Sequence, residues 1–116
     1  WEIPAGLLDV AGESKLNAAQ RELHEETGWV ATQWEELTSF YTTPGGNSEE
    51  ITIFLAQDLS FRGHSLKLEG EEVDMEVAWV PMAEAVTSVM KSEMKSPSAV
   101  VGIMALAIWM RAGLAE

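Results

Sequence analysis

Residues 6–30, GLLDVAGESKLNAAQRELHEETGWV, are the most informative part of the sequence for predicting the fold. Residues 15–27 are expected to form a helix, because apolar residues recur there at helical spacing. Ser14 is a suitable N-cap, and Gly28 stands where a left-handed residue commonly ends a helix. The predicted apolar face consists of Leu16, Ala19 and Leu23.

Three glutamates, Glu22, Glu25 and Glu26, crowd the C-terminal end of this predicted helix. Helix C-termini carry partial negative charge, so carboxylates are disfavoured there. A partly buried pair of like charges about 4 Å apart can repel by up to about 4 kcal/mol. A hard divalent cation would remove this cost, and magnesium prefers oxygen ligands. For three glutamates alone, an acidic solvent-facing helix is the competing interpretation.

The wider pattern around the glutamates favours a functional site. The order Arg, Glu, apolar, any, Glu, Glu, any, Gly, apolar arises by chance on the order of once per million positions. With the seven-residue gap from Glu13 to Arg21, the stretch resembles a Nudix box, the signature of Nudix hydrolases. One departure is that six residues, instead of the usual five, separate Gly6 from Glu13.

The resemblance implies a metal site on this helix. Arg21 would orient the glutamates and pair with Glu13, for which a plain surface salt bridge worth under about 1 kcal/mol is the alternative. The implied metal ligands are the backbone carbonyl of Ala5 and the carboxylates of Glu22, Glu25 and Glu26. The implied cofactor is Mg²⁺, with Mn²⁺ as a possible substitute.

A second landmark concerns the substrate. Pro44 lies fifteen residues beyond Trp29, within TTPGGNSEE, and the ADP-ribose pyrophosphatases of the Nudix family have a proline at about this distance. The resemblance implies that the carboxylate of Glu49 accepts hydrogen bonds from ribose hydroxyls. A tight turn is the alternative interpretation. The implied substrate-binding residues are Gly6, Thr43, Pro44, Gly45 and Glu49.

The acidic segment EGEEVDME, residues 69–76, is expected to supply the general base. In the enzymes that it resembles, a glutamate before the last strand activates water. The alignment favours Glu71 over Glu72 without separating them firmly. Neighbouring carboxylates would raise the pKa of this base and improve it as a proton acceptor. A solvated acidic loop is the alternative.

Composition narrows the possible partners and the location. The chain has 116 residues, no cysteine and a formal net charge of −12, which argues against a nucleic acid or an anionic membrane as the main partner. Its longest apolar run, residues 99–110, is shorter than the roughly 20 residues that a membrane span needs. With no visible signal peptide, a cytoplasmic protein is expected. The apolar run and the family likeness favour a homodimer.

The predicted fold is of the α/β (α+β) class, a Nudix-type α/β/α sandwich with a mixed sheet in a single catalytic domain over residues 1–116. The resembling enzymes have a further N-terminal region, which the present sequence is expected to lack. Five tryptophans are expected in the core or at an interface. Strands are expected at 1–4, 51–59 and 76–81, residues 29–41 hold β-prone segments, and further helices are expected at 82–92 and 98–113.

The implied reaction is the magnesium-dependent hydrolysis of ADP-ribose to AMP and ribose 5-phosphate. Two alternatives remain. The substrate could be another nucleoside diphosphate sugar or a nucleoside triphosphate, or the chain could be a non-catalytic, ligand-sensing relative.

Overall fold

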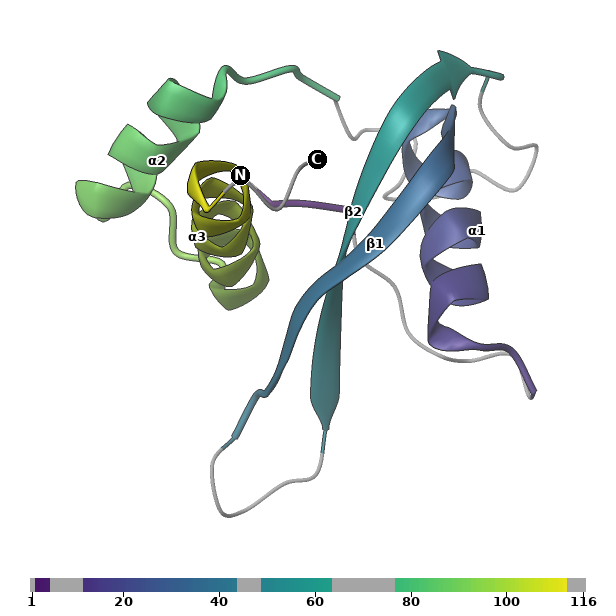
Figure 1. Ribbon diagram of the computed structural model, residues 1–116, viewed down its shortest axis with the longest axis horizontal. Helices are drawn as coiled ribbons and strands as arrows, with labels where there is room; N and C mark the ends of the chain where they lie inside the picture. Colours follow the sequence, from purple (N-terminus) through teal and green to yellow (C-terminus); the bar gives the residue numbers. More distant parts are fainter. Residues whose placement is uncertain (1, 5–11, 44–48, 64–76, 113–116) are drawn as a thin grey trace. The chain divides into compact units, whose positions relative to one another are not determined.

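Three helices and one hairpin make up the part of the chain that the structure, a computed structural model, describes (Figure 1). The described residues are 2–4, 12–43, 49–63 and 77–112. In chain order the elements are α1 (Lys15–Thr27), β1 (Trp29–Tyr41), β2 (Glu50–Phe61), α2 (Met82–Met90) and α3 (Pro97–Arg111). This combination of helices and paired antiparallel strands confirms the predicted α+β class.

Local capping sets both ends of α1. The hydroxyl of Ser14 accepts a hydrogen bond from the backbone N–H of Asn17 at 3.1 Å, which satisfies one of the unpaired donors of the first turn. Gly28 adopts a left-handed conformation with φ 80° and donates its N–H to the carbonyl of His24 at 2.9 Å. The predicted helix over residues 15–27 is therefore confirmed.

Strands β1 and β2 pair as a two-stranded antiparallel hairpin. At the end nearest α1, the N–H of Arg62 donates to the carbonyl of Gly28 at 2.8 Å. Beside this bond, the rings of Trp29 and Phe61 meet edge to face with centroids 5.4 Å apart. The hairpin therefore holds the end of α1 next to the point where the chain leaves β2.

The chain divides into two compact units. One comprises residues 4–35 and 56–78 and contains α1. The other comprises residues 1–3, 36–55 and 79–116 and contains α2 and α3, which pack against each other. Both strands of the hairpin run from one unit into the other.

Helix α3 has a glycine where its neighbours come close. A Cβ atom on Gly102 would lie 3.1 Å from the Cδ1 atom of Ile3 and 3.6 Å from the Cγ2 atom of Ile53. Ala99 and Trp109 are also buried on this helix, with 1% and 8% of their surface exposed. The absence of a side chain at Gly102 therefore lets this apolar core close.

The Gly102→Val variant is expected to lower the free energy of unfolding by about 1–3 kcal/mol, because its methyl groups would overlap Ile3 and Ile53. Chemical denaturation followed by circular dichroism measures this change. Ala83→Val on the exposed side of α2 is the matched control and should change stability far less. Equal effects of both substitutions would contradict the packing role of Gly102.

Two predicted strands are absent from the described residues. Residues 2–4 and 77–81 belong to no strand, so the predictions of strands at 1–4 and 76–81 are wrong for these parts. An apolar run favours a strand, but a strand also needs a hydrogen-bonded neighbour, which local sequence does not reveal. Trp79 is 66% exposed and lies outside the core of the described chain.

The remaining predictions hold with small shifts at the ends. The predicted helices 82–92 and 98–113 correspond to α2 and α3, and the predicted strand 51–59 lies within β2. Among the described residues, no helix has both the length and the hydropathy that crossing a bilayer requires.

Candidate functional site

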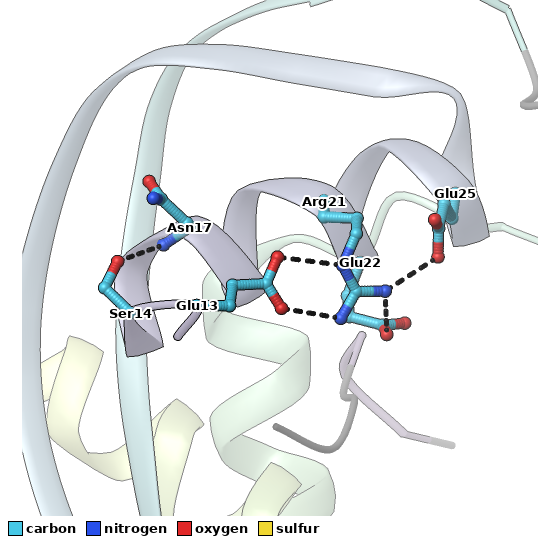
Figure 2. A network of polar contacts seen from close by, with 6 residues as sticks. All are labelled: Glu13, Ser14, Asn17, Arg21, Glu22 and Glu25. Atoms are coloured by element: carbon cyan, nitrogen blue, oxygen red, sulfur yellow. Dashed lines mark hydrogen bonds and ion pairs between the residues drawn. The ribbon is translucent and has the colours of Figure 1, made fainter. Parts of the chain in front are cut away.

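Arg21 is the centre of a polar network on α1 (Figure 2). Its Nε donates to Oε2 of Glu13 at 3.0 Å, and its Nη2 donates to Oε1 of the same carboxylate at 3.1 Å. Its Nη1 donates to Oε1 of Glu22 at 2.9 Å and to Oε2 of Glu25 at 3.1 Å. One guanidinium therefore holds three carboxylates, and it holds that of Glu13 through two parallel bonds.

The start and the pitch of α1 bring these groups together. Glu13 directly precedes the N-cap residue Ser14, so its carboxylate lies at the N-terminal end of the helix. Arg21 and Glu25 are four residues apart and therefore share a helix face. The long side chain of Arg21 reaches back to Glu13, eight residues earlier in the sequence. It also reaches the neighbouring Glu22.

The network is largely shielded from solvent. Of the side-chain surfaces, 25% is exposed in Arg21, 13% in Glu13, 15% in Glu22 and 20% in Glu25. The hydrogen bonds from Arg21 to Glu13 raise the pKa of the guanidinium above its ordinary value. Burial acts in the opposite direction, and the charges of Glu13 and Glu22 add to the increase. Arg21 therefore stays charged, and its pair with Glu13 differs from an exposed surface salt bridge.

The donor chemistry of this network suits a hard cation. Three carboxylates share one guanidinium, so the group carries an excess of negative charge, and carboxylate oxygens are ligands that Mg²⁺ prefers. Glu26, partly buried on the same helix, adds another carboxylate. In the part of the chain that the structure describes, no three Asp, Glu or His side chains are placed together as a metal-binding group. The Oε1 atom of Glu22 and the Oε2 atom of Glu25 instead accept hydrogen bonds from Arg21.

The predicted ribose-binding residues Thr43 and Glu49 belong to the other compact unit, and both are exposed. The Oε1 atom of Glu49 accepts a hydrogen bond from the hydroxyl of Thr42 at 3.0 Å, and the N–H of Thr42 donates to the carbonyl of Glu49 at 3.2 Å. The sequence analysis names Thr43 for ribose binding and makes no prediction for Thr42, so this contact is one that it did not reveal. The other predicted site residues, Ala5, Gly6, Pro44, Gly45, Glu71 and Glu72, lie outside the described residues.

His24 makes a second contact that the sequence does not reveal. Its Nε2 atom lies 3.1 Å from the carbonyl oxygen of Gly63, which is 39 residues away. No local pattern relates it to a residue beyond β2, because the contact depends on how the hairpin returns to α1.

Comparison with known proteins identifies relatives that match most of this chain. The model of the NUDIX domain matches residues 1–100. An ADP-ribose pyrophosphatase of Mycobacterium tuberculosis is 42% identical over 106 residues, which cover 91% of this chain and 51% of the relative. An ADP-ribose pyrophosphatase of Bacillus subtilis is 40% identical over 92 residues, or 79% of this chain and 49% of the relative.

A solved structure described as an ADP compounds hydrolase is also similar. It superimposes with a TM-score of 0.74 at 30% sequence identity, covering 93% of this chain and 56% of the other. The present chain therefore spans about half the length of the curated relatives that it matches.

Proposed function

Because this chain belongs to the NUDIX domain family, we propose that it hydrolyses the pyrophosphate bond of ADP-ribose, giving AMP and ribose 5-phosphate in a reaction that depends on Mg²⁺. The two relatives described above are both ADP-ribose pyrophosphatases. The structural neighbour is described as a hydrolase of ADP compounds. These names support the choice of substrate class.

The observation that carries the proposal is the shielded Arg21 network. An acidic helix that only served solubility would hold its carboxylates in water, whereas Glu13 and Glu22 are 13% and 15% exposed. Within this network the single positive charge of Arg21 faces three carboxylates. A cation that completes the balance explains why they are gathered on one helix.

In this proposal Mg²⁺, or Mn²⁺ in its place, is held by Glu22, Glu25, Glu26 and the carbonyl of Ala5. When bound, the ion would offset charge on the phosphoryl oxygens and lower the pKa of the attacking water. The two hydrogen bonds from Arg21 to Glu13 fix the orientation of the guanidinium. The guanidinium in turn keeps the metal-binding carboxylates oriented.

Residues of this chain then assist the hydrolysis of the pyrophosphate bond. A water oxygen bonds to phosphorus, the bond from that phosphorus to the bridging oxygen breaks, and the water proton passes to Glu71 or Glu72. Glu49 would accept hydrogen bonds from the hydroxyls of the terminal ribose. The further substrate contacts proposed from the sequence are Gly6, Thr43, Pro44 and Gly45.

Three further proposals come from the sequence. Residues 1–116 form one catalytic domain, in which both compact units share the hairpin. The protein is cytoplasmic. It is also a homodimer, to which the 64% exposed Ile108 and the 52% exposed Met110 on the apolar α3 lend support.

A substrate panel tests the proposed function. ADP-ribose, GDP-mannose, UDP-glucose and ATP are each incubated with the protein and Mg²⁺, and the released nucleotide is quantified by chromatography. We expect kcat/KM for ADP-ribose to exceed the others by at least about 10-fold and to vanish with a chelator. Preference for ATP or for another nucleotide sugar would replace the proposed substrate. Binding of ADP-ribose without AMP release would favour a sensing module.

A further inference from the structure

His24 links the acidic end of α1 to the chain that leaves β2. Its Nε2 atom lies 3.1 Å from the carbonyl oxygen of Gly63. A carbonyl oxygen only accepts hydrogen bonds, so Nε2 must carry a hydrogen and act as the donor. The neutral imidazole is therefore expected as the tautomer with its hydrogen on Nε2, and the ring is partly buried.

The hydrogen bond from His24 lies one residue beyond the backbone hydrogen bond that joins Arg62 to Gly28. Strand β2 ends at Phe61, and the N–H of Arg62 makes the bond to the carbonyl of Gly28. One residue later, Gly63 has φ +85°, a left-handed conformation that glycine adopts without strain. The side chain of His24 thus binds the carbonyl of Gly63, the residue directly after Arg62.

His24 is well placed to act without touching the proposed metal ligands. Successive helical residues are about 100° apart, so His24 projects from roughly the opposite side of α1 to Glu22 and Glu26, each two positions away. Arg21 holds Glu22 through a hydrogen bond that does not involve His24. Loss of the imidazole should therefore leave the carboxylate network in place.

We propose that His24 is a positioning residue, which sets the point where the chain leaves β2 relative to the carboxylates of α1. The inference rests on the proposed function, in which the general base, Glu71 or Glu72, follows Gly63 in the sequence. The base must meet a water molecule activated at the carboxylate cluster. The hydrogen bond from His24 to Gly63 fixes, relative to the helix that carries the carboxylates, the point from which the chain continues to the base.

Three variants separate this role from a general structural one. His24→Leu removes the donor, His24→Gln restores an N–H of similar reach, and Gln20→Leu makes a matched change at an exposed position one turn earlier. We expect His24→Leu to lower kcat for ADP-ribose about 10-fold, because a small displacement of reacting groups is costly. Manganese affinity, measured by calorimetry, should be unchanged. His24→Gln should recover most of the rate, and Gln20→Leu should behave as wild type.

Nuclear magnetic resonance gives a readout that does not need turnover. The ¹⁵N shifts of the imidazole report which nitrogen carries the hydrogen, and we expect Nε2. Hydrogen exchange at the Arg62 amide should be faster in His24→Leu than in wild type or in Gln20→Leu, since the neighbouring residue has lost its anchor.

The outcomes decide between the possibilities. The inference is wrong if His24→Leu keeps the wild-type kcat, if His24→Gln fails to restore it, or if manganese affinity falls together with kcat. If the wild-type protein releases no AMP, the proposed function fails. The positioning role is then judged on exchange at Arg62: faster exchange in His24→Leu supports it, and unchanged exchange overturns it.

Discussion

Glu26→Gln is expected to abolish magnesium-dependent release of AMP from ADP-ribose while leaving the fold intact. The amide has nearly the same shape as the carboxylate but lacks its charge, and Mg²⁺ prefers charged oxygen ligands. Loss of one such interaction should lower kcat by at least about 10²–10³-fold, since it removes electrostatic stabilisation where charge develops. Release of AMP at saturating substrate measures the change.

Two controls make the result on Glu26 specific. Glu35→Gln removes one negative charge at an exposed position on β1 and should retain full activity. Thermal unfolding of Glu26→Gln should match the wild type or improve on it, because one of several like charges near a helix C-terminus has gone. Retained turnover in Glu26→Gln would refute its proposed role as a metal ligand, and calorimetry with Mn²⁺ should show weakened uptake in parallel.

Arg21→Lys is expected to lower kcat/KM by about 10–100-fold, although the positive charge is kept. Residues that orient metal ligands typically have effects of this size. The ammonium group is a compact charge and cannot reproduce the fork that binds both oxygens of Glu13 while Nη1 reaches Glu22 and Glu25. Steady-state kinetics at several Mg²⁺ concentrations measure the loss, and the half-saturating Mg²⁺ concentration should rise.

Arg62→Lys is the matched control for Arg21→Lys. Arg62 is exposed, and the bond described for it uses its backbone N–H. The same substitution there should leave both kcat/KM and the magnesium dependence unchanged. If Arg21→Lys also behaved as wild type, a single point charge would suffice. The bidentate geometry would then have no part in the activity.

The helix that carries the site could be predicted from the sequence because its determinants are local. Ser14 and Gly28 lie at the two ends of α1, and the cap at each end involves residues only a few positions away. The pairing of Arg21 with Glu13 came from the family resemblance, since the residues alone also allowed an exposed salt bridge. The structure shows the pair partly buried, with two bonds.

The contacts that the sequence did not reveal are non-local or depend on side-chain direction. His24 meets Gly63 only because the hairpin brings the chain back to α1. Trp79 was expected in the core or at an interface, but burial in the core needs a neighbouring element that an apolar run does not specify. At Glu49, the hydroxyl of Thr42 donates a hydrogen bond that no pattern in the sequence indicates.

The positive charge of Arg21 bears on whether the chain can fold before it binds a metal ion. A cluster of anions with no internal counter-ion would have to wait for a metal before its helix could settle, as in small metal-dependent domains. Here the polypeptide brings its own positive charge to three of these groups. Folding therefore need not wait for a metal, and in the proposed function ion uptake would be a later exchange of one cationic partner for another.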